Sequence, residues 1–332
     1  MQAPTARSRV IGPAAVAAAL LAAALGVRAL TDAAAPPLPD ALSDFVTLAM
    51  SVFIESLPFV FLGILISTAV QVWMPQHVID RVMPRRPALR RAVLSVTGIL
   101  LPVCECGNVP LARGLMVRGF SVAEAATFLL AAPVLNPVTI VTTYQAFGWS
   151  DGILVARIAG GFAIANLAGW VLSRSRDESA LLTPGFRAHC DHTHHDEQPG
   201  RWQRSLVSIA EETSALMPAL VVGSAIAGAI QVGAPRELLV ALGAHPLWSV
   251  LALLALAFVI AICSSVDAFF ILSLSSTFLP GSIVAFLLFG AMMDVKMLAL
   301  LRTTFTGRAL ALLASLVALS CLVIGWGLNL VA

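Results

Sequence analysis

Long apolar stretches dominate this chain and constrain its fold more than any other feature of the sequence. About nine of them run along the 332 residues, and each is close to the roughly 20 apolar residues with which a helix crosses a bilayer. Hydrophobic residues make up 59% of the chain and charged residues only 11%, outside the range of ordinary soluble domains. The sequence therefore predicts an all-α polytopic membrane protein without a large soluble domain. The stretches cover residues 10–30, 42–72, 92–117, 121–147, 152–171, 205–232, 246–277, 282–301 and 309–331.

Charge and motif content exclude several classes of function. A net charge of +2 is too small to indicate a nucleic-acid partner. No Gly-x-x-x-x-Gly-Lys-Ser/Thr phosphate loop is present, so we expect no nucleotide hydrolysis by this chain. The five cysteines are an odd number and form no disulfide-type framework. We expect a permease rather than an enzyme, without a cofactor, driven by an ion gradient or by a separate partner.

Two parts of the chain have a similar plan. Pro58 and Gln71 in the first part match Pro218 and Gln231 in the second, with the same spacing and small residues between them. At nearly the same offset Cys104 matches Cys263, Asn108 matches Asp267, and Asn136 falls close to Asp294. Such in-register matches predict an internal duplication. The predicted units are residues 1–41 as membrane anchor and Pro-rich turn, 42–173 as first transmembrane repeat, 174–204 as His-rich cytoplasmic linker, and 205–332 as second transmembrane repeat.

The positions of the basic residues indicate the orientation. If every stretch crossed once, Lys and Arg would divide almost evenly between the two sides, against the positive-inside tendency. If residues 92–117 and 246–277 are instead broken hairpins, nearly all basic residues become cytoplasmic. Each repeat then has three spans plus one re-entrant segment near the midplane, and the second repeat is inverted, which is typical of secondary transporters. Singly kinked helices stay the alternative. The exceptions to the cytoplasmic set are Arg28, Arg236, Arg157 and Lys296.

The first break carries the sharpest local signal. Residues 102–110 read PVCECGNVP, and two prolines with a glycine between them do not sustain an uninterrupted helix. Irregular backbone at membrane depth is tolerated only in contact with protein or a cavity. Cys104 and Cys106 are soft ligands suited to Cu(I), trivalent arsenic or a sulfur-containing solute, and Glu105 suits a proton or a cation. We predict a solute site here that includes Asn108; two small buried thiols are the bland alternative.

The second break lies at residues 263–267, whose sequence is CSSVD. Cys263, Ser264 and Asp267 bring a thiol, a hydroxyl and a carboxylate into an apolar segment. Because an aspartate at a helix centre costs at least about 2.5 to 3.5 kcal/mol, we expect Asp267 to be functional or paired. Asp294 and Lys296 follow in the next stretch, two residues apart, and helical spacing would make them face different ways. Asp267 and Glu105 are then the expected anions for Lys296, with a structural ion pair as the alternative.

Asn136 adds a polar group to the corresponding stretch of the first part. It lies between Pro133 and Pro137, which free backbone carbonyls in a span, and its amide offers both donor and acceptor. We place it beside the solute site. Three further charged residues in apolar stretches lie near enough to helix ends for snorkelling or capping to explain them: Glu55, Glu124 and Arg157.

The linker holds a tract of borderline metal ligands. Short His-rich tracts bind Zn, Ni or Cu weakly, and a solvated polar loop without fixed metal is an equal alternative. The candidate metal ligands are His189, Cys190, His192, His194 and His195.

Three segments together resemble one family. Residues 102–111 (PVCECGNVPL), residues 113–115 (RGL) and residues 128–137 (FLLAAPVLNP) are similar to the ArsP-type predicted permeases, also called YraQ/YcgR-like, and residues 263–269 (CSSVDAF) match their second motif. The resemblance covers most of the chain from about residue 44 and implies, for some members, efflux of trivalent organoarsenicals. The family pattern implies a Cys-Ser-Cys-Gly run where this chain has Glu105, an added anion that favours a cation over a neutral arsenical.

The leading hypothesis is a secondary transporter in the inner membrane, with its N-terminus in the cytoplasm, that moves a small thiophilic solute or a metal or metalloid species by alternating access. A divalent-metal permease aided by the His-rich linker is the second hypothesis. A membrane redox protein that uses the Cys104–Cys106 pair is the third, although Cys-x-Cys forms only a strained disulfide. The expected partners are the lipid bilayer and the solute, with a homodimer or an accessory membrane subunit left open.

Overall fold

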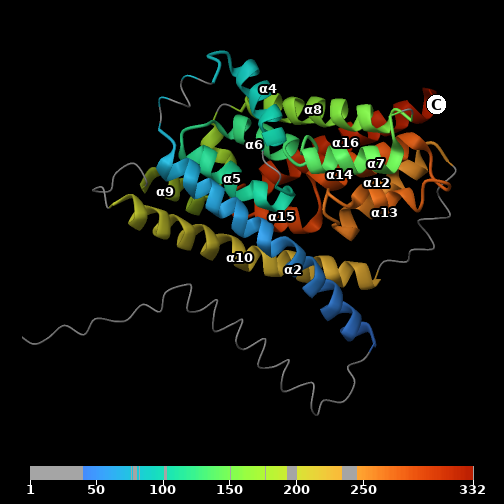
Figure 1. The fold of residues 1–332 in the computed structure, drawn as a ribbon, viewed down its shortest axis with the longest axis horizontal. Helices are drawn as coiled ribbons and strands as arrows, with labels where there is room; N and C mark the ends of the chain where they lie inside the picture. Colours follow the sequence, from blue (N-terminus) through green and yellow to red (C-terminus); the bar gives the residue numbers. More distant parts are fainter. Residues whose placement is uncertain are drawn as a thin grey trace, which may run out of the picture.

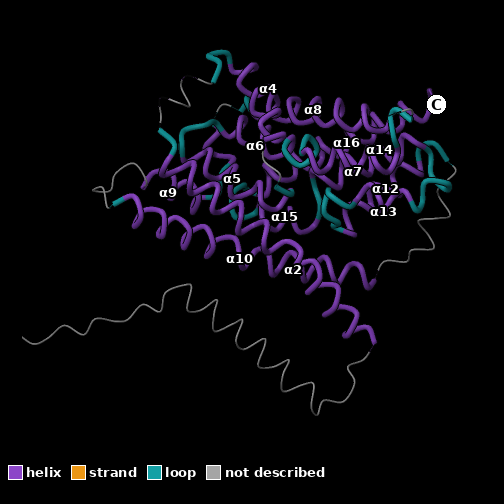
Figure 2. Tube along the Cα trace, viewed as in Figure 1, coloured by secondary structure: helices purple, strands orange, loops and turns teal. Residues whose placement is uncertain are grey.

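A computed structural model describes most of the chain from residue 40 onward, and within those residues it contains helices and loops but no strand (Figures 1 and 2). Five helical segments are long and apolar enough to cross a membrane. The predicted all-α membrane protein is therefore confirmed at this level, while the predicted N-terminal anchor lies outside the described residues. The described residues are 40–75, 77, 81, 83–100, 103–149, 151–175, 177–192, 200–233 and 245–331.

Two sets of helices are separated by the 173–200 connection. The first set comprises α2 (Asp40–Thr68), α4 (Pro87–Thr97), α5 (Glu105–Val117), α6 (Val122–Ala131), α7 (Pro137–Phe147) and α8 (Ile153–Leu172). The short helix α9 (Pro184–His192) lies in the connection. The second set comprises α10 (Arg201–Gly233), α12 (Trp248–Ile260), α13 (Asp267–Leu272), α14 (Pro280–Met292), α15 (Val295–Leu301) and α16 (Gly307–Val331).

The helices form layers around two central segments. All of α6 is buried, and the α14–α15 segment is far more enclosed than the other candidate spans. Helix α8 covers α6, α16 covers α14, and α8 and α16 also touch each other. On the opposite face α2 and α10 pack side by side along their length (Figure 1). Their outer surfaces are apolar, as expected of helices that face lipid.

Four of the apolar stretches are interrupted where the sequence offers helix breakers or caps, and one of them is 282–301, which is split into α14 and α15 at Met293 and Asp294. Residues 92–117 and 246–277 are each split, as the sequence predicts, into α4 and α5 and into α12 and α13. The stretch 121–147, expected to be one span, is instead split into α6 and α7. The reason is local, because Asn136 caps α7 with its side chain and Pro137 occupies the first turn, a combination that begins a new helix rather than continuing one.

Local chemistry also fixes other helix starts. Ser121 and Glu124 form a reciprocal capping box at the start of α6, and Glu124 additionally pairs with Arg90 at 2.8 Å. The expectation that capping explains Glu124 is therefore confirmed. Helix α15 begins at Asp294, whose carboxylate accepts a hydrogen bond from the Met297 amide at 2.6 Å.

Contacts between distant connections define one end of the bundle, which we call the basic end. Residues of four connections meet there, namely Met74, Arg118, Glu178, Thr183 and Thr304. The connections 73–86, 118–121, 173–200 and 302–306 carry many of the arginines of the sequence. Arg118 donates to the Met74 carbonyl, and the Val122 amide donates to Glu178 at 2.8 Å. The far end holds the turns 148–152 and 273–279, the end of α10 and the end of α16, whose Asn329 bonds the Pro246 carbonyl.

The connection between the two helix sets is docked at the basic end rather than looped out. Leu182 pairs with Phe305 in an isolated antiparallel bridge, and backbone hydrogen bonds of 2.9 Å join Thr183 to Thr304 and Thr306 to Leu181. Asp177 begins this segment as an N-cap, and the hydrogen bond from the Ser179 hydroxyl holds the pKa of the Asp177 carboxyl below its usual value.

Candidate functional site

Two helix breaks meet in the interior of the bundle. One precedes α5, where Cys104 is the N-cap in extended backbone. The other separates α12 from α13, and it begins at Ala261, whose φ of 51° is left-handed. The Sγ of Cys263 in this second break lies 3.8 Å from the Oε2 of Glu105 at the start of α5. The two segments are therefore in contact, while the shared solute site expected from the sequence stays a prediction.

Glu105 is the centre of this contact. Its carboxylate is 1% exposed and forms an ion pair of 2.9 Å with Lys296 from α15. The Oε2 atom also accepts from the Ser264 hydroxyl at 3.3 Å and the Ser264 amide at 3.5 Å. Burying a charged group is costly unless it is paired and hydrogen-bonded, so these partners compensate for the burial of Glu105.

Asp294 supplies a second carboxylate beside the same ammonium. Its Oδ2 lies 3.8 Å from the Nζ of Lys296. The prediction that these residues face different ways is wrong, because Asp294 is not helical but caps α15 in extended backbone, so helical spacing does not apply to it. Lys296 thus bridges two carboxylates, Glu105 and Asp294. Of the two anions expected from the sequence, Glu105 is confirmed as its partner, and Asp267 is paired elsewhere.

The two thiols of the first break flank Glu105. One ligand atom each from Cys104, Glu105 and Cys106 lies within 4.8 Å of the others, and all three residues are buried. Cys106 reaches α2, where its Sγ lies 3.8 Å from the Ser56 hydroxyl. Two sulfurs and one carboxylate oxygen at this spacing suit a soft or borderline ion, which is the chemistry expected from the sequence.

Asp267 pairs with Arg157 and not with Lys296 of this cluster. Arg157 from α8 binds both carboxylate oxygens of Asp267 at 3.0 and 2.5 Å, and donates to Thr143 on α7 at 2.7 Å. Arg157 is only 1% exposed. The expectation that Arg157 snorkels to a helix end is wrong, and the alternative of a paired Asp267 is correct. This ion pair ties the second break to the first set of helices.

The two asparagines differ in how their amides are used. Asn136 donates to the Val103 carbonyl at 2.9 Å and accepts from the Val138 amide at 2.9 Å, so it joins α7 to the first break. Asn108 is fully buried, and neither of its side-chain polar atoms has a hydrogen-bond partner among the described residues. Since a buried amide without partners costs about 1 to 3 kcal/mol, Asn108 is a candidate for contact with a ligand.

The predicted metal ligands of the linker are only partly described. His189 stacks on Phe186 and lies 3.6 Å from Glu211 and 3.9 Å from Glu212. Cys190 is half-buried, and His192 ends α9, but nothing is described of the His192 side chain. His194 and His195 lie outside the described residues, so metal binding by this tract stays a prediction.

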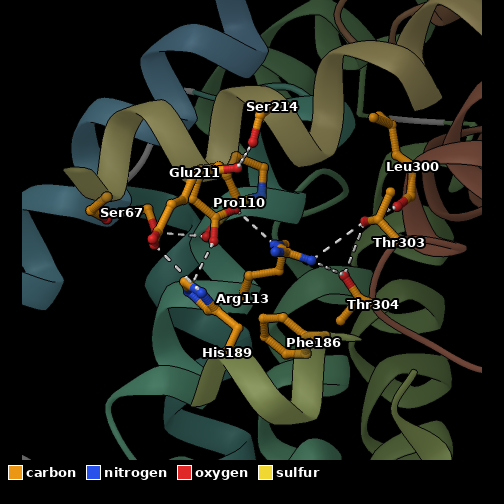
Figure 3. Close-up of polar contacts among 12 residues, drawn as sticks. Ser67, Pro110, Arg113, Phe186, His189, Glu211, Ser214, Leu300, Thr303 and Thr304 are labelled. Carbon is orange, nitrogen blue, oxygen red and sulfur yellow. Dashed lines mark hydrogen bonds and ion pairs between the residues drawn. The ribbon is translucent and has the colours of Figure 1, made fainter. Parts of the chain in front are cut away.

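A third buried ion pair, which the sequence analysis missed, lies at the basic end (Figure 3). Arg113 on α5 donates to Glu212 on α10 at 2.7 Å and to the Thr304 hydroxyl at 3.0 Å. Its guanidinium also lies 4.2 Å from the centre of the Phe186 ring on α9. Arginine within an apolar stretch was the available signal, but the partner is 99 residues away, and no local pattern identifies it.

Comparison with known proteins agrees with this architecture. A family model described as a predicted permease, ArsP_1, matches residues 41–330. The chain belongs to this predicted permease family. It is 34% identical to the UPF0718 protein YcgR of Bacillus subtilis over 266 residues, which are 80% of this chain and 90% of the relative.

Two further members of the permease family are similar over most of the chain. A protein of Streptococcus mutans named putative two-component membrane permease complex subunit is 28% identical over 87% of this chain and 97% of its own length. The UPF0718 protein YraQ of Escherichia coli is 25% identical over 83% of this chain and 78% of its own length. No solved structure matches this permease.

Proposed function

We propose that this permease is a secondary transporter that moves a small thiophilic solute, or a metal or metalloid cation, by alternating access. The observation that carries the proposal is the contact between the two helix breaks inside the bundle. There Cys104, Glu105 and Cys106 meet Cys263 and Lys296 in a fully buried cluster. Ionisable groups at membrane depth are costly, and in membrane proteins they mark solute and ion pathways.

The donor set favours a soft cation. Two thiols bind thiophilic ions, while the Glu105 carboxylate adds negative charge that a neutral solute would not need. The Lys296 ammonium already sits 2.9 Å from Glu105 and neutralises it. A cationic solute that binds the thiols would take over part of this role, so Lys296 would move away from Glu105 as the solute enters and return as it leaves.

We further propose that the two helix sets are inverted repeats, with residues 92–117 and 246–277 as re-entrant segments. Three features support this. The sets have the same order of long and broken helices, Cys104 and Cys263 occupy corresponding breaks, and Asn136 and Asp294 each cap the helix that follows a break. In Figure 1 the pair α4–α5 lies toward α9 and the pair α12–α13 toward the C-terminus.

In this proposal the protein lies in the inner membrane of the cell. Its basic end would then face the cytoplasm, because basic residues are enriched on the cytoplasmic side of membrane proteins. The name of the Streptococcus mutans relative, a subunit of a two-component permease complex, supports an accessory membrane subunit as partner. In that arrangement the accessory subunit, rather than an ion gradient, would drive transport.

Flux measurements test the proposal. The purified protein in proteoliposomes would be assayed with arsenite, methylarsenite, zinc, copper(I) and cobalt. We expect Cys104→Ser combined with Cys106→Ser to lower the flux of the transported species at least about tenfold, since the two soft ligands are lost. The matched control is Cys321→Ser, which removes a buried thiol of α16.

Full flux in the folded Cys104→Ser, Cys106→Ser protein would contradict the proposed site. A zinc flux that falls when His192, His194 and His195 are replaced by Ala would favour the divalent-metal alternative. Flux of none of these species by the unmodified protein would contradict the thiophilic substrate class.

A further inference from the structure

A pocket of about 500 Å³ lies outside the buried cluster, between α2 and the α12–α13 break. Four residues of α2 line it at helical spacing, namely Leu48, Ser51, Val52 and Glu55. Gln231 at the end of α10 and residues of α12 and α13 form the other walls. Most of the lining is apolar, and Glu55 is the one ionisable side chain in it.

The pocket belongs to the far half of the bundle and ends next to the buried cluster. Its lining includes Phe278 in the far-end turn and Gln231 near the end of α10. Its lining also includes Ala261 and Ile262, which directly precede Cys263 in the chain. Since Cys263 contacts Glu105, this short non-helical segment links the lining of the pocket to the proposed solute site.

Helix packing closes the opposite side of the cluster. Helix α2 lies so close to α5 that a Cβ on Gly63 would come within 2.1 Å of the Gly107 carbonyl oxygen. Helix α10 also packs closely on α15, where a Cβ on Gly223 would come within 2.8 Å of the Ala299 Cβ and 3.1 Å of the Lys296 Cα. Arg113 and Glu212 then join α5 to α10 nearer the basic end. Access toward the basic end is therefore blocked by backbone contacts and an ion pair.

Helices α7 and α13 are not covered in this way. They pack on each other, but among the described helices neither makes more than marginal contact with α2 or α10. Val138 and Val141 on α7 and Val266 and Phe269 at α13 are 41% to 52% exposed. The α2–α10 pair thus covers α5 and α15, which run toward the basic end, but not α7 and α13, which run toward the far end. Such an asymmetry is expected of one state of an alternating-access carrier.

Glu55 gives the pocket its chemistry. The expectation that Glu55 lies near a helix end is wrong, because it lies near the middle of α2. No ion pair or hydrogen bond of the described residues includes it. A carboxylate at this depth costs at least about 2.5 to 3.5 kcal/mol unless water or a cation reaches it. Apolar walls next to one carboxylate complement a ligand with an apolar body and a positive charge.

We propose that this pocket is the outward-facing vestibule of the transport path, and that it receives cations with an apolar body through Glu55. The inference rests on the proposed transport function for its role, but the binding itself is measurable without transport. Ser51, one helical turn before Glu55, lines the same pocket and reports on it.

Charge-selective labelling tests the proposal. In intact cells that express Ser51→Cys, a cationic and an anionic membrane-impermeant methanethiosulfonate reagent of similar size would be added from outside. We expect the cationic reagent to react about tenfold faster, because a carboxylate in an apolar cleft concentrates cations. Tetraphenylphosphonium should slow this labelling, and its anionic isostere tetraphenylborate should not. The unmodified chain gives the background of native cysteines.

Two matched variants separate the pocket from general effects. Adding Glu55→Gln should remove both the preference for the cationic reagent and the protection by tetraphenylphosphonium. Adding Asp44→Asn, which removes a carboxylate of α2 outside the pocket, should leave both unchanged. Ser214→Cys, on α10 toward the basic end, should not react from outside.

Equal rates for the two reagents, a preference that survives Glu55→Gln, or labelling only from the cytoplasmic side would each overturn the inference. None of these outcomes bears on the cysteine-dependent flux, so the proposed function would stand. Conversely, loss of the proposed function through the flux test would leave a cation-binding pocket without a transport role.

Discussion

Removing one member of the buried Arg157–Asp267 pair should destabilise the protein strongly. Asp267→Leu removes the acceptor of two charge-assisted hydrogen bonds, at 3.0 and 2.5 Å, and leaves the guanidinium of Arg157 buried with Thr143 as its remaining partner. Hydrogen bonds to charged groups contribute about 1.5 to 3 kcal/mol each, and breaking a buried pair by removing one partner costs about 3 to 5 kcal/mol. We expect a loss in that range.

Replacing both members by apolar residues should recover most of this loss. The double variant Arg157→Met, Asp267→Leu leaves no unpaired charge, and such replacements are often neutral for stability. The free energy of unfolding would be measured for the wild type, both single variants and the double variant by titration with SDS in mixed micelles, followed by tryptophan fluorescence. The four values form a double-mutant cycle.

Single variants whose free energy of unfolding lies within about 1 kcal/mol of the wild-type value would refute the argument, because a buried unpaired charge destabilises a protein by more than that. A double variant that is no more stable than the single variant Asp267→Leu would also refute it. The same double variant addresses function. If Asp267 acts only by pairing, the stable double variant should retain flux, whereas loss of flux with normal stability would return Asp267 to the solute site.

Three further predictions concern individual contacts. Lys296→Met should abolish flux and lower the free energy of unfolding, because Glu105 and Asp294 lose their common cation. Adding Glu105→Gln should restore stability, measured by SDS titration, but not flux, measured in proteoliposomes. Gly63→Ala should cost about 1 to 3 kcal/mol by forcing α2 from α5, whereas Gly327→Ala, with open space around it, should cost less than about 0.5 kcal/mol; equal costs would contradict the close helix contact. Ala261→Val should lower the free energy of unfolding by more than about 1 kcal/mol, since a β-branched residue fits the left-handed region poorly, and Ala261→Gly should not; similar effects of the two changes would exclude backbone strain as the cause.

The sequence predicted the features that depend on neighbouring residues. Proline and glycine in residues 102–110 and the short polar run at 263–267 predicted the two helix breaks, because breakers act locally. The signals at Asn136 and Pro137 are also local, but a kinked helix and two capped helices look alike in a hydropathy pattern, so the sequence predicts one span where the structure has two helices. The buried Glu124 was explained by its capping box for the same local reason.

The pairing of distant charges could not be predicted in this way. Asp267 and Arg157 are 110 residues apart, and Glu212 and Arg113 are 99 residues apart. Only the tertiary fold determines which of these residues form ion pairs. The prediction that Asp294 and Lys296 face different ways failed for another reason. The rule for side-chain direction assumes a helix, and the backbone at Asp294 is extended. Burial of an ionisable residue was thus predictable, but its partner was not.

The docking of the linker has a consequence for the order in which the protein is made. Thr183 bonds the Thr303 carbonyl, a partner 120 residues later in the chain. At about 5 to 20 residues per second, the linker leaves the ribosome roughly 6 to 24 seconds before its docking partner exists. The first helices must therefore insert while the linker is still undocked, and the bridge of Leu182 to Phe305 can form only when the second set of helices is nearly complete. This closing contact would then act as a late assembly step, so that a chain truncated before residue 303 leaves the linker open to proteases.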